Sequence, residues 1–139
     1  MINEMVAAIT TKLQGGTVLC NLLALGTASI YHLQAPDVPV SAPYPYVVFN
    51  LQTGGPLNQT PKDMRDELFW VRGYSQVSDS EAGSIDGEIS KLLHKGTVAV
   101  TGYTTMAVMR ETDIALIENP PNLEKIWVAG GIYRFRLDN

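Results

Sequence analysis

Four prolines, at positions 36, 39, 43 and 45, divide this chain into two kinds of sequence. Proline fixes φ and lacks an amide hydrogen, so such a run forbids a helix and the centre of a sheet. Apolar residues before the prolines recur at helical spacing, whereas β-branched and aromatic residues after them gather in runs typical of strands. We therefore expect an extended connector between a helical beginning and a sheet.

The segment before the prolines predicts two helices and a brief strand. A second helix is expected over residues 17–25, with Thr17 as its cap and Gly26 in the left-handed conformation that closes a last turn. Residues 30–33 can form a short strand. The first helix, which Gly15 and Gly16 end, is indicated by apolar residues three and four positions apart, Ile2, Met5, Val6, Ile9 and Leu13.

Two aromatic and β-branched runs, residues 46–52 and 67–74, are natural partners in an antiparallel hairpin. The loop between them, residues 53–62, is polar, rich in glycine and proline, and longer than most hairpin loops. Loops of that length are usually functional or disordered, so we expect this one to meet a partner. Tyr44 and Tyr46, with Trp70 or Trp127, could add an exposed apolar patch, or they could belong to a rigid connector and a core strand.

A third helix is expected over residues 79–95. Ser78 and Glu81 have the spacing of a capping box, and Gly96 stands where a C-terminal glycine is favoured. The buried stripe of this helix is predicted to contain Ala82, Ile85, Ile89, Leu92 and Leu93.

The rest of the chain predicts an edge segment at residues 98–100, a strand over 103–111, a turn at 119–122 and a last strand over 125–137. Gly130 and Gly131 suggest a bulge or bend in that last strand. Alternation places Arg134 and Arg136 opposite the apolar Tyr133, Phe135 and Leu137. The order of elements predicts an α+β fold, a two-layer sandwich of a mostly antiparallel or mixed sheet with helices on one face.

The bulk properties limit what this fold can do. A chain of 139 residues, 45% hydrophobic and 17% charged, is expected to form one domain, residues 1–139. A net charge of −4 argues against a surface that grips phosphates, because tight nucleic-acid binding relies on clustered lysine and arginine. No run approaches the length of a membrane span, and the N-terminus lacks the pattern of a secretion signal, so we expect a cytosolic product.

Catalytic chemistry is not indicated, and we expect neither a metal nor a cofactor. His94 is expected in a last helical turn, where a positive charge suits the helix dipole, and Cys20 lies in an apolar run typical of a buried thiol. Neither His32 nor His94 has an acidic or sulfur neighbour at ligand spacing. The acidic residues Asp63, Asp66 and Glu67 around Arg65 are expected to be exposed and solvated.

Several segments of the sequence, taken in chain order, resemble the layout of a known protein family. They are the leading helix pair, the strand at Ile30-Tyr31, Pro43-Tyr44-Pro45-Tyr46-Val47-Val48, Arg72-Gly73-Tyr74-Ser75, the helix over 79–95, and Tyr133-Arg134-Phe135-Arg136-Leu137. This layout resembles the tail terminator, or tail completion, proteins of long-tailed bacteriophages and prophages over nearly the whole chain. The segment 114–124 departs from the pattern.

The resemblance implies a structural subunit that is not an enzyme and needs no cofactor. Such a subunit forms a ring, expected to be a hexamer, on the polymerised tail tube, stops tail growth, and meets the head or neck connector, while DNA passes without specific binding. We expect it in the head-proximal tail of the virion, with no membrane partner. The alternatives are a neck (head-tail joining) protein and, from another class, a small ligand-binding or enzymatic domain. The candidate contact residues are Thr53, Gly54, Gly55, Pro56, Leu57, Asn58, Gln59, Thr60, Pro61, Lys62, Asp63, Arg65, Arg134 and Arg136.

Overall fold

The computed structural model describes residues 2–36, 43–56, 64–119, 121 and 124–138. Its elements follow the predicted order, and the predicted α+β sandwich is confirmed. In chain order they are α1 (Ile2–Gln14), α2 (Thr17–Leu22), the 3₁₀ helix η1 (Gly26–Ser29), β1 (Ile30–His32), β2 (Tyr46–Pro56), β3 (Met64–Ser75), α3 (Asp79–Leu93), β4 (Thr104–Glu118) and β5 (Ile126–Asp138).

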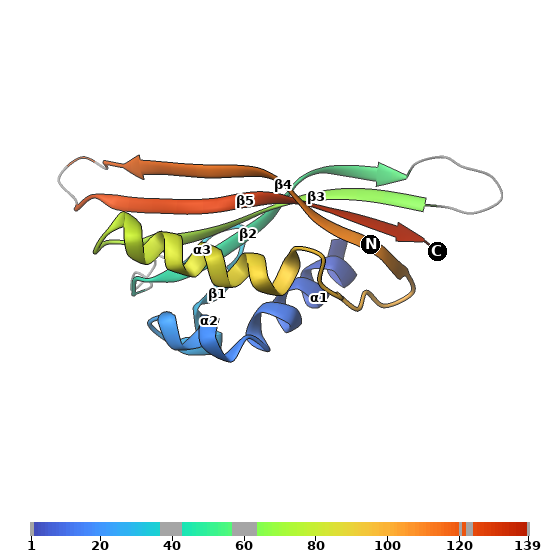
Figure 1. Ribbon diagram of the computed structural model, residues 1–139, viewed down its shortest axis with the longest axis horizontal. Helices are drawn as coiled ribbons and strands as arrows, with labels where there is room; N and C mark the ends of the chain where they lie inside the picture. The colour runs from blue at the N-terminus through green and yellow to red at the C-terminus, as the bar shows by residue number, and fades with distance from the viewer. Residues whose placement is uncertain (1, 37–42, 57–63, 120, 122–123, 139) are drawn as a thin grey trace.

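The five strands form one mixed sheet in the order β1-β2-β3-β5-β4. β1 runs parallel to β2, and every other neighbouring pair is antiparallel. The helices lie together under one face of this sheet, and the other face is left without a helical layer (Figure 1). β1 and β4 are the two edges of the sheet, and β4 is much the longer of the two.

The core lies between the sheet and the helices because each element turns its apolar stripe inward. Strand residues alternate between the two faces, so Phe69 and Val71 of β3 meet the helices while Trp70 and Arg72 point away from them. In β5 the predicted alternation is confirmed, with Tyr133 and its apolar successors buried. The fully buried large side chains are Met5, Ile9, Leu13, Leu19, Phe49, Phe69, Ile85, Ile89, Leu93, Tyr133, Phe135 and Leu137.

The cap of α3 is confirmed in one half and differs in the other. The Ser78 hydroxyl accepts a hydrogen bond from the Glu81 amide at 3.1 Å, as a capping box requires. The Glu81 carboxylate, however, accepts from the hydroxyl of Ser75 at 2.8 Å. The Ser75 oxygen in turn accepts from the amides of Val77 and Ser78. A buried serine at the end of β3 therefore joins the strand to the helix.

The predicted helix ends need correction. α2 follows Gly16, so Thr17 is its first residue and no side chain caps it; it ends at Leu22 because Leu23 turns extended and Ala24 donates its amide to Pro45. Gly26 does have positive φ, but it opens η1. After α3 it is Lys95 that has positive φ (57°), not Gly96. A Cβ at Gly96 would lie 2.3 Å from the Leu92 carbonyl oxygen, so Gly96 is needed for close packing.

β2, β3 and β4 are longer than predicted. Thr53 to Pro56, predicted as loop, continue β2, and the rest of the predicted loop, residues 57–62, lies outside the described residues. Segment 114–118 continues β4, whereas residues 98–100 form no strand although Val98 and Val100 are buried. β5 pairs with β3 without a register shift at Gly130 and Gly131; the shifts occur in β4, at 105/107 and 110/112. The glycines instead allow close approach, since a Cβ at Gly130 would lie 2.3 Å from the Val71 carbonyl oxygen.

Candidate interaction surface

The face of the sheet opposite the helices carries a row of aromatic rings at one end. Tyr46 is buried at the centre of this row, stacked on Tyr74 with ring centroids 5.1 Å apart and flanked by Tyr44 at 4.6 Å and Tyr31 at 5.7 Å. Burial, with its neighbour Tyr44, raises the pKa of the Tyr46 hydroxyl, so this ring is neutral. Tyr46 therefore does not contribute to an exposed apolar patch, which was one of the two alternatives, because the neighbouring rings cover it.

Arg72 extends the aromatic row along β3. Its guanidinium carbon lies 4.0 Å from the ring centroid of Trp70 and 5.7 Å from that of Tyr74, which are cation–π distances. Its Nη2 donates to the Asn50 side-chain oxygen at 2.6 Å. The Trp70 indole nitrogen is buried and has no hydrogen-bond partner among the described residues. This end of the open face is thus a packed surface of aromatic rings and one arginine.

The opposite end of the open face carries both predicted arginines of β5. Arg134 donates from Nε to Glu111 at 2.7 Å and from Nη1 to the Asp66 carboxylate. These two hydrogen bonds raise the pKa of Arg134, and the one to Glu111 contributes more. Arg136 approaches Asp66 only to 3.7 Å, and 48% of its side chain is exposed. Of the two arginines, Arg136 is the more exposed and the less closely paired.

Arg65 and its acidic neighbours are not a solvated cluster as predicted. Arg65 donates from Nε to Glu67 at 2.9 Å, and Glu67 is buried. The Glu67 carboxylate folds across Gly54, where a Cβ would lie 1.8 Å from its Oε2. Asp66 is also largely covered, and Asp63 lies outside the described residues. Gly54, which was predicted to lie in the loop, therefore leaves room for the buried carboxylate of Glu67.

A groove of about 760 Å³ lies at the β4 edge, between that strand and α3. We call it the β4 groove. It is apolar along residues 114–117 and 127–129, and Asp79, Asp86 and Asp113 are among the residues that line it. Trp127 lies here, beside α3, and so does not contribute to the aromatic row.

Arg110 holds the two walls of the β4 groove together. Its Nη1 and Nη2 each donate to Asp86 of α3 at 2.8 Å, and its Nε donates to Asp113 at 2.6 Å. It also donates to the Tyr133 hydroxyl at 3.0 Å and to the Gly130 carbonyl at 2.9 Å. The pairing with Asp86 raises the pKa of Arg110, so the guanidinium stays charged. α3, β4 and β5 are thus joined through one side chain.

The edge of β4 is covered over part of its length. The Lys95 amide donates to the Val108 carbonyl at 2.7 Å, and the Arg110 amide donates to Nδ1 of His94 at 3.0 Å. His94 therefore follows α3 as a hydrogen-bond acceptor, whereas a charged residue near the helix dipole was predicted. Within the described part of the chain, no hydrogen bond from another segment reaches the backbone of residues 113–118 on this edge. We call residues 113–118 the open half of β4.

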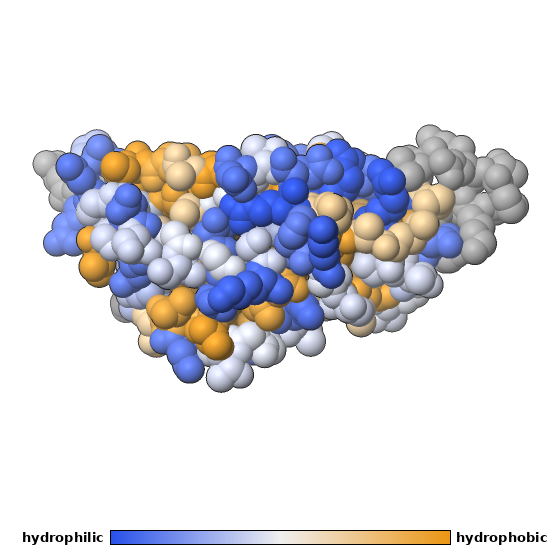
Figure 2. Space-filling view, viewed as in Figure 1, coloured by the Kyte–Doolittle hydropathy of each residue, from blue (hydrophilic) through white to orange (hydrophobic). Residues whose placement is uncertain are grey.

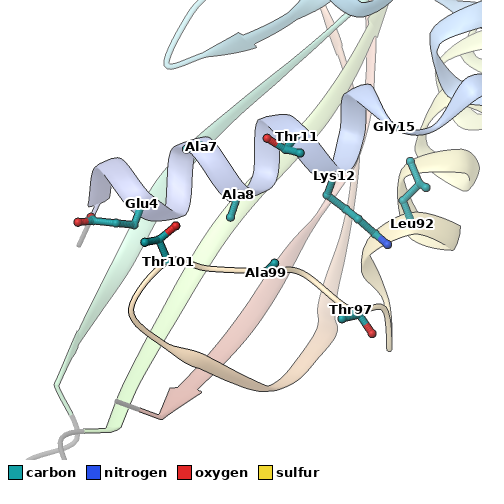
Figure 3. A pocket seen from close by; sticks show the side chains of 10 residues that line it. All are labelled: Glu4, Ala7, Ala8, Thr11, Lys12, Gly15, Leu92, Thr97, Ala99 and Thr101. Atoms are coloured by element: carbon teal, nitrogen blue, oxygen red, sulfur yellow. The ribbon is translucent and has the colours of Figure 1, made fainter.

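A second hollow, of about 390 Å³, lies between α1 and the segment that follows α3. Alanine and threonine side chains line most of it, and its charged groups, Glu4 and Lys12, stand at opposite ends (Figure 3). The residues that the structure describes contain no group of three or more histidine, cysteine or acidic side chains placed to hold a metal. In the same residues, no helix is long and apolar enough to cross a membrane.

Comparison with known proteins gives a match in fold. No protein-family model matches the sequence, and no curated protein is similar to it in sequence. Among solved structures, the fold is similar to that of a chain in the virion of a native gene transfer agent particle, with a TM-score of 0.74. The similarity covers 96% of this chain and 93% of that chain, at 15% sequence identity. At this identity the two chains share a fold.

Sequence reasoning located some of these features and missed others. Alternation placed Arg134 and Arg136 on the open face, where the structure has them. The β4 groove was missed because the strand was predicted to end at Glu111. The four consecutive apolar residues 114–117 were the signal that could have extended it. Arg110 was missed because its partner Asp86 is 24 positions away in the chain.

Proposed function

We propose that this protein is a tail terminator of a long-tailed phage or phage-like particle. It caps the polymerised tail tube as a ring of identical copies, stops tail growth, and presents a surface to the head or neck connector. The observation that carries the proposal is the fold shared, over almost the full length of both chains, with a chain of a phage-like virion. The sequence phrases that resemble tail terminators run through the same elements.

The surfaces described above support a role in assembly without catalysis. The open face presents packed aromatic rings at one end and a charged cluster at the other, and a groove runs along the β4 edge. Such a combination of apolar area and polar surroundings is typical of protein interfaces. In the proposed ring the partners are copies of the chain itself, the major tail tube protein and a connector protein, and no cofactor takes part.

DNA passes through such a ring, and the charge of the chain suits passage better than retention. The net charge is −4, and Arg134 of the open face is paired with Asp66 and Glu111. A channel of unpaired cations would hold phosphates by counterion release. We therefore expect weak binding to duplex DNA, and a tight affinity that falls steeply with added salt would contradict this part of the proposal.

Deletion of the gene in its phage or prophage, followed by electron microscopy of the particles, tests the proposal. Over-long tails are expected, because nothing then ends the growth of the tube. Tails of normal length that fail to join heads would assign the neck role instead. Normal, joined particles would contradict both roles.

Complementation of the deletion tests the candidate contact residues. Arg136→Glu reverses an exposed charge on the open face, and we expect it to reduce the yield of joined particles. Lys91→Glu is the control, because Lys91 is 74% exposed and lies on α3, away from that face. Equal yields from the two variants would remove Arg136 from the proposed contact.

A further inference from the structure

The stretch 13–36 contains no aspartate, glutamate, lysine or arginine. At the average composition of the chain, 17% of these 24 residues, or about four, would be charged. The stretch is not simply buried, because α2 and the turn after it lie on the outside of the molecule (Figure 1). A surface depleted of charge is the compositional signature of an interface core.

α2 presents an apolar ridge on its outer side. Leu19 and Leu23 are buried in the core, whereas Val18, Leu22 and Leu25 are 59%, 37% and 53% exposed. We call these three exposed residues the α2 ridge. α2 also exposes the polar Thr17 and Asn21. A surface helix normally turns mainly polar residues outward, so large apolar side chains exposed beside them are unusual. Val18 and Leu22 lie one helical turn apart on α2, and Leu25 lies in the turn that follows the helix, so the ridge spans both.

The β4 groove has the matching properties. Residues 114–117 line it; their side chains alternate between the two faces of the sheet, so Ala115 and Ile117 are turned toward α3, and Ile117 is 53% exposed. Asp79 and Asp113 line it as polar groups, and Asp113 is largely exposed. An uncharged ridge can enter this groove without burying an unpaired charge, which would be costly. Because Arg110 joins α3 to β4, the two walls are held in place before a partner arrives.

The two surfaces lie on different sides of the molecule. In Figure 2 one apolar patch overlies the end of β4 at the upper margin of the view, and another overlies α2 at the lower margin, both in its left half. A closed ring of identical subunits is built from a contact in which one surface of each copy meets a different surface of the next. A groove on one side and a complementary ridge on the other satisfy that requirement.

We propose that the α2 ridge of one copy docks in the β4 groove of the next copy. The inference rests on the proposed ring, for which it supplies the contact between neighbours. Apolar contacts at Val18, Leu22 and Leu25 provide the attraction, and the aspartates around the groove stay in water. The part of β4 before Arg110 is excluded from the contact because His94 and Lys95 already occupy its edge.

Three single variants test the contact by sedimentation velocity, with concentration raised into the millimolar range. Ile117→Lys places a charge in the groove, and Leu25→Glu places one on the ridge; each is expected to weaken self-association at least tenfold. Met106→Lys is the matched control, since Met106 is 54% exposed on the same strand but lies outside the β4 groove, and this variant should associate like the wild type. All three sites are exposed, so the variants should fold normally, as circular dichroism will verify.

Mixing the variants distinguishes a head-to-tail contact from a symmetric one. Ile117→Lys keeps an intact ridge and Leu25→Glu keeps an intact groove, so an equimolar mixture should form a dimer that does not grow further. A symmetric pairing of two β4 edges would instead let Leu25→Glu dimerise alone and would overturn the proposal. Equal weakening by Met106→Lys, or a mixture that stays monomeric, would do the same.

Disulfide trapping detects the contact even when it is weak in solution. In a Cys20→Ser background, Leu25→Cys with Ile117→Cys should give a ladder of linked chains on oxidation, and either cysteine alone should not. A wild-type chain that stays monomeric at every concentration, together with a failure to trap, overturns the contact. Over-long tails in the gene deletion would still support the terminator role, so the two proposals can fail separately.

Discussion

Replacing Arg110 with methionine removes the side chain that joins α3, β4 and β5. The methionine keeps most of the apolar stem but leaves both oxygens of Asp86 and the Tyr133 hydroxyl without their donor. The Arg110 and Asp86 side chains are 13% and 18% exposed. Water can therefore reach Asp86 in part, and the loss should fall below that of a fully buried pair. We expect the free energy of unfolding to drop by about 2–4 kcal/mol.

Urea unfolding at neutral pH measures this loss, and a double-mutant cycle with Asp86→Ala isolates the pair. For a domain of this size the melting temperature should fall by roughly 8–16 °C. Lys91→Met is the control, because its ion pair with Glu88 is exposed and should contribute less than about 0.5 kcal/mol. A loss below about 1 kcal/mol, or a coupling energy no larger than that of the exposed pair, would refute the assigned role of Arg110.

Three further predictions concern the fold. Gly130→Ala should destabilise the protein by about 2–3 kcal/mol in urea unfolding, because the added Cβ would meet the Val71 carbonyl oxygen; Gly55→Ala, which meets nothing within 4 Å, is its control. Ser78→Ala should cost about 1 kcal/mol through loss of the α3 cap, and an unchanged urea midpoint would contradict that cap. Burial raises the pKa of Tyr133 in the folded state despite the neighbouring Arg110. Stability should therefore be full below about pH 10, the unfolded tyrosine pKa, and fall as pH rises further, by up to about 1.4 kcal/mol per pH unit for this residue. Tyr133→Phe should make the alkaline loss of stability shallower, and an unaltered pH profile would contradict the shift.

The sequence predicts this fold best where local periodicity and burial agree. α1 and α3 carry buried stripes at helical spacing, and β5 alternates between buried and more exposed residues from Gly131 to Asp138, so each was found within a few residues of its bounds. The ends of the helices and strands were harder to predict, because they depend on groups that are distant in the sequence. α2 ends just before Ala24 donates its amide to the Pro45 carbonyl, and the sequence near Leu22 gives no sign of that distant partner.

The interaction surface is less accessible to sequence reasoning for the same reason. Exposed and buried charges look alike in a sequence, so Glu67 was taken for a solvated group although it is buried over Gly54. The β4 groove forms when the end of β4 and Trp127 of β5 come to lie beside α3, which no local pattern specifies. The sequence shows that residues 114–117 are apolar, but it does not show that they lie at the edge of a sheet, where they can form an interaction surface.

In the proposed ring, the charge-free stretch 13–36 would affect how the contact between copies responds to salt. Dissolved ions screen charged contacts strongly and leave apolar ones almost untouched. A junction formed by α2 would hold nearly the same strength in dilute medium as inside a cell. In the proposed ring, that contact would then not loosen when the particle passes from one environment to the other.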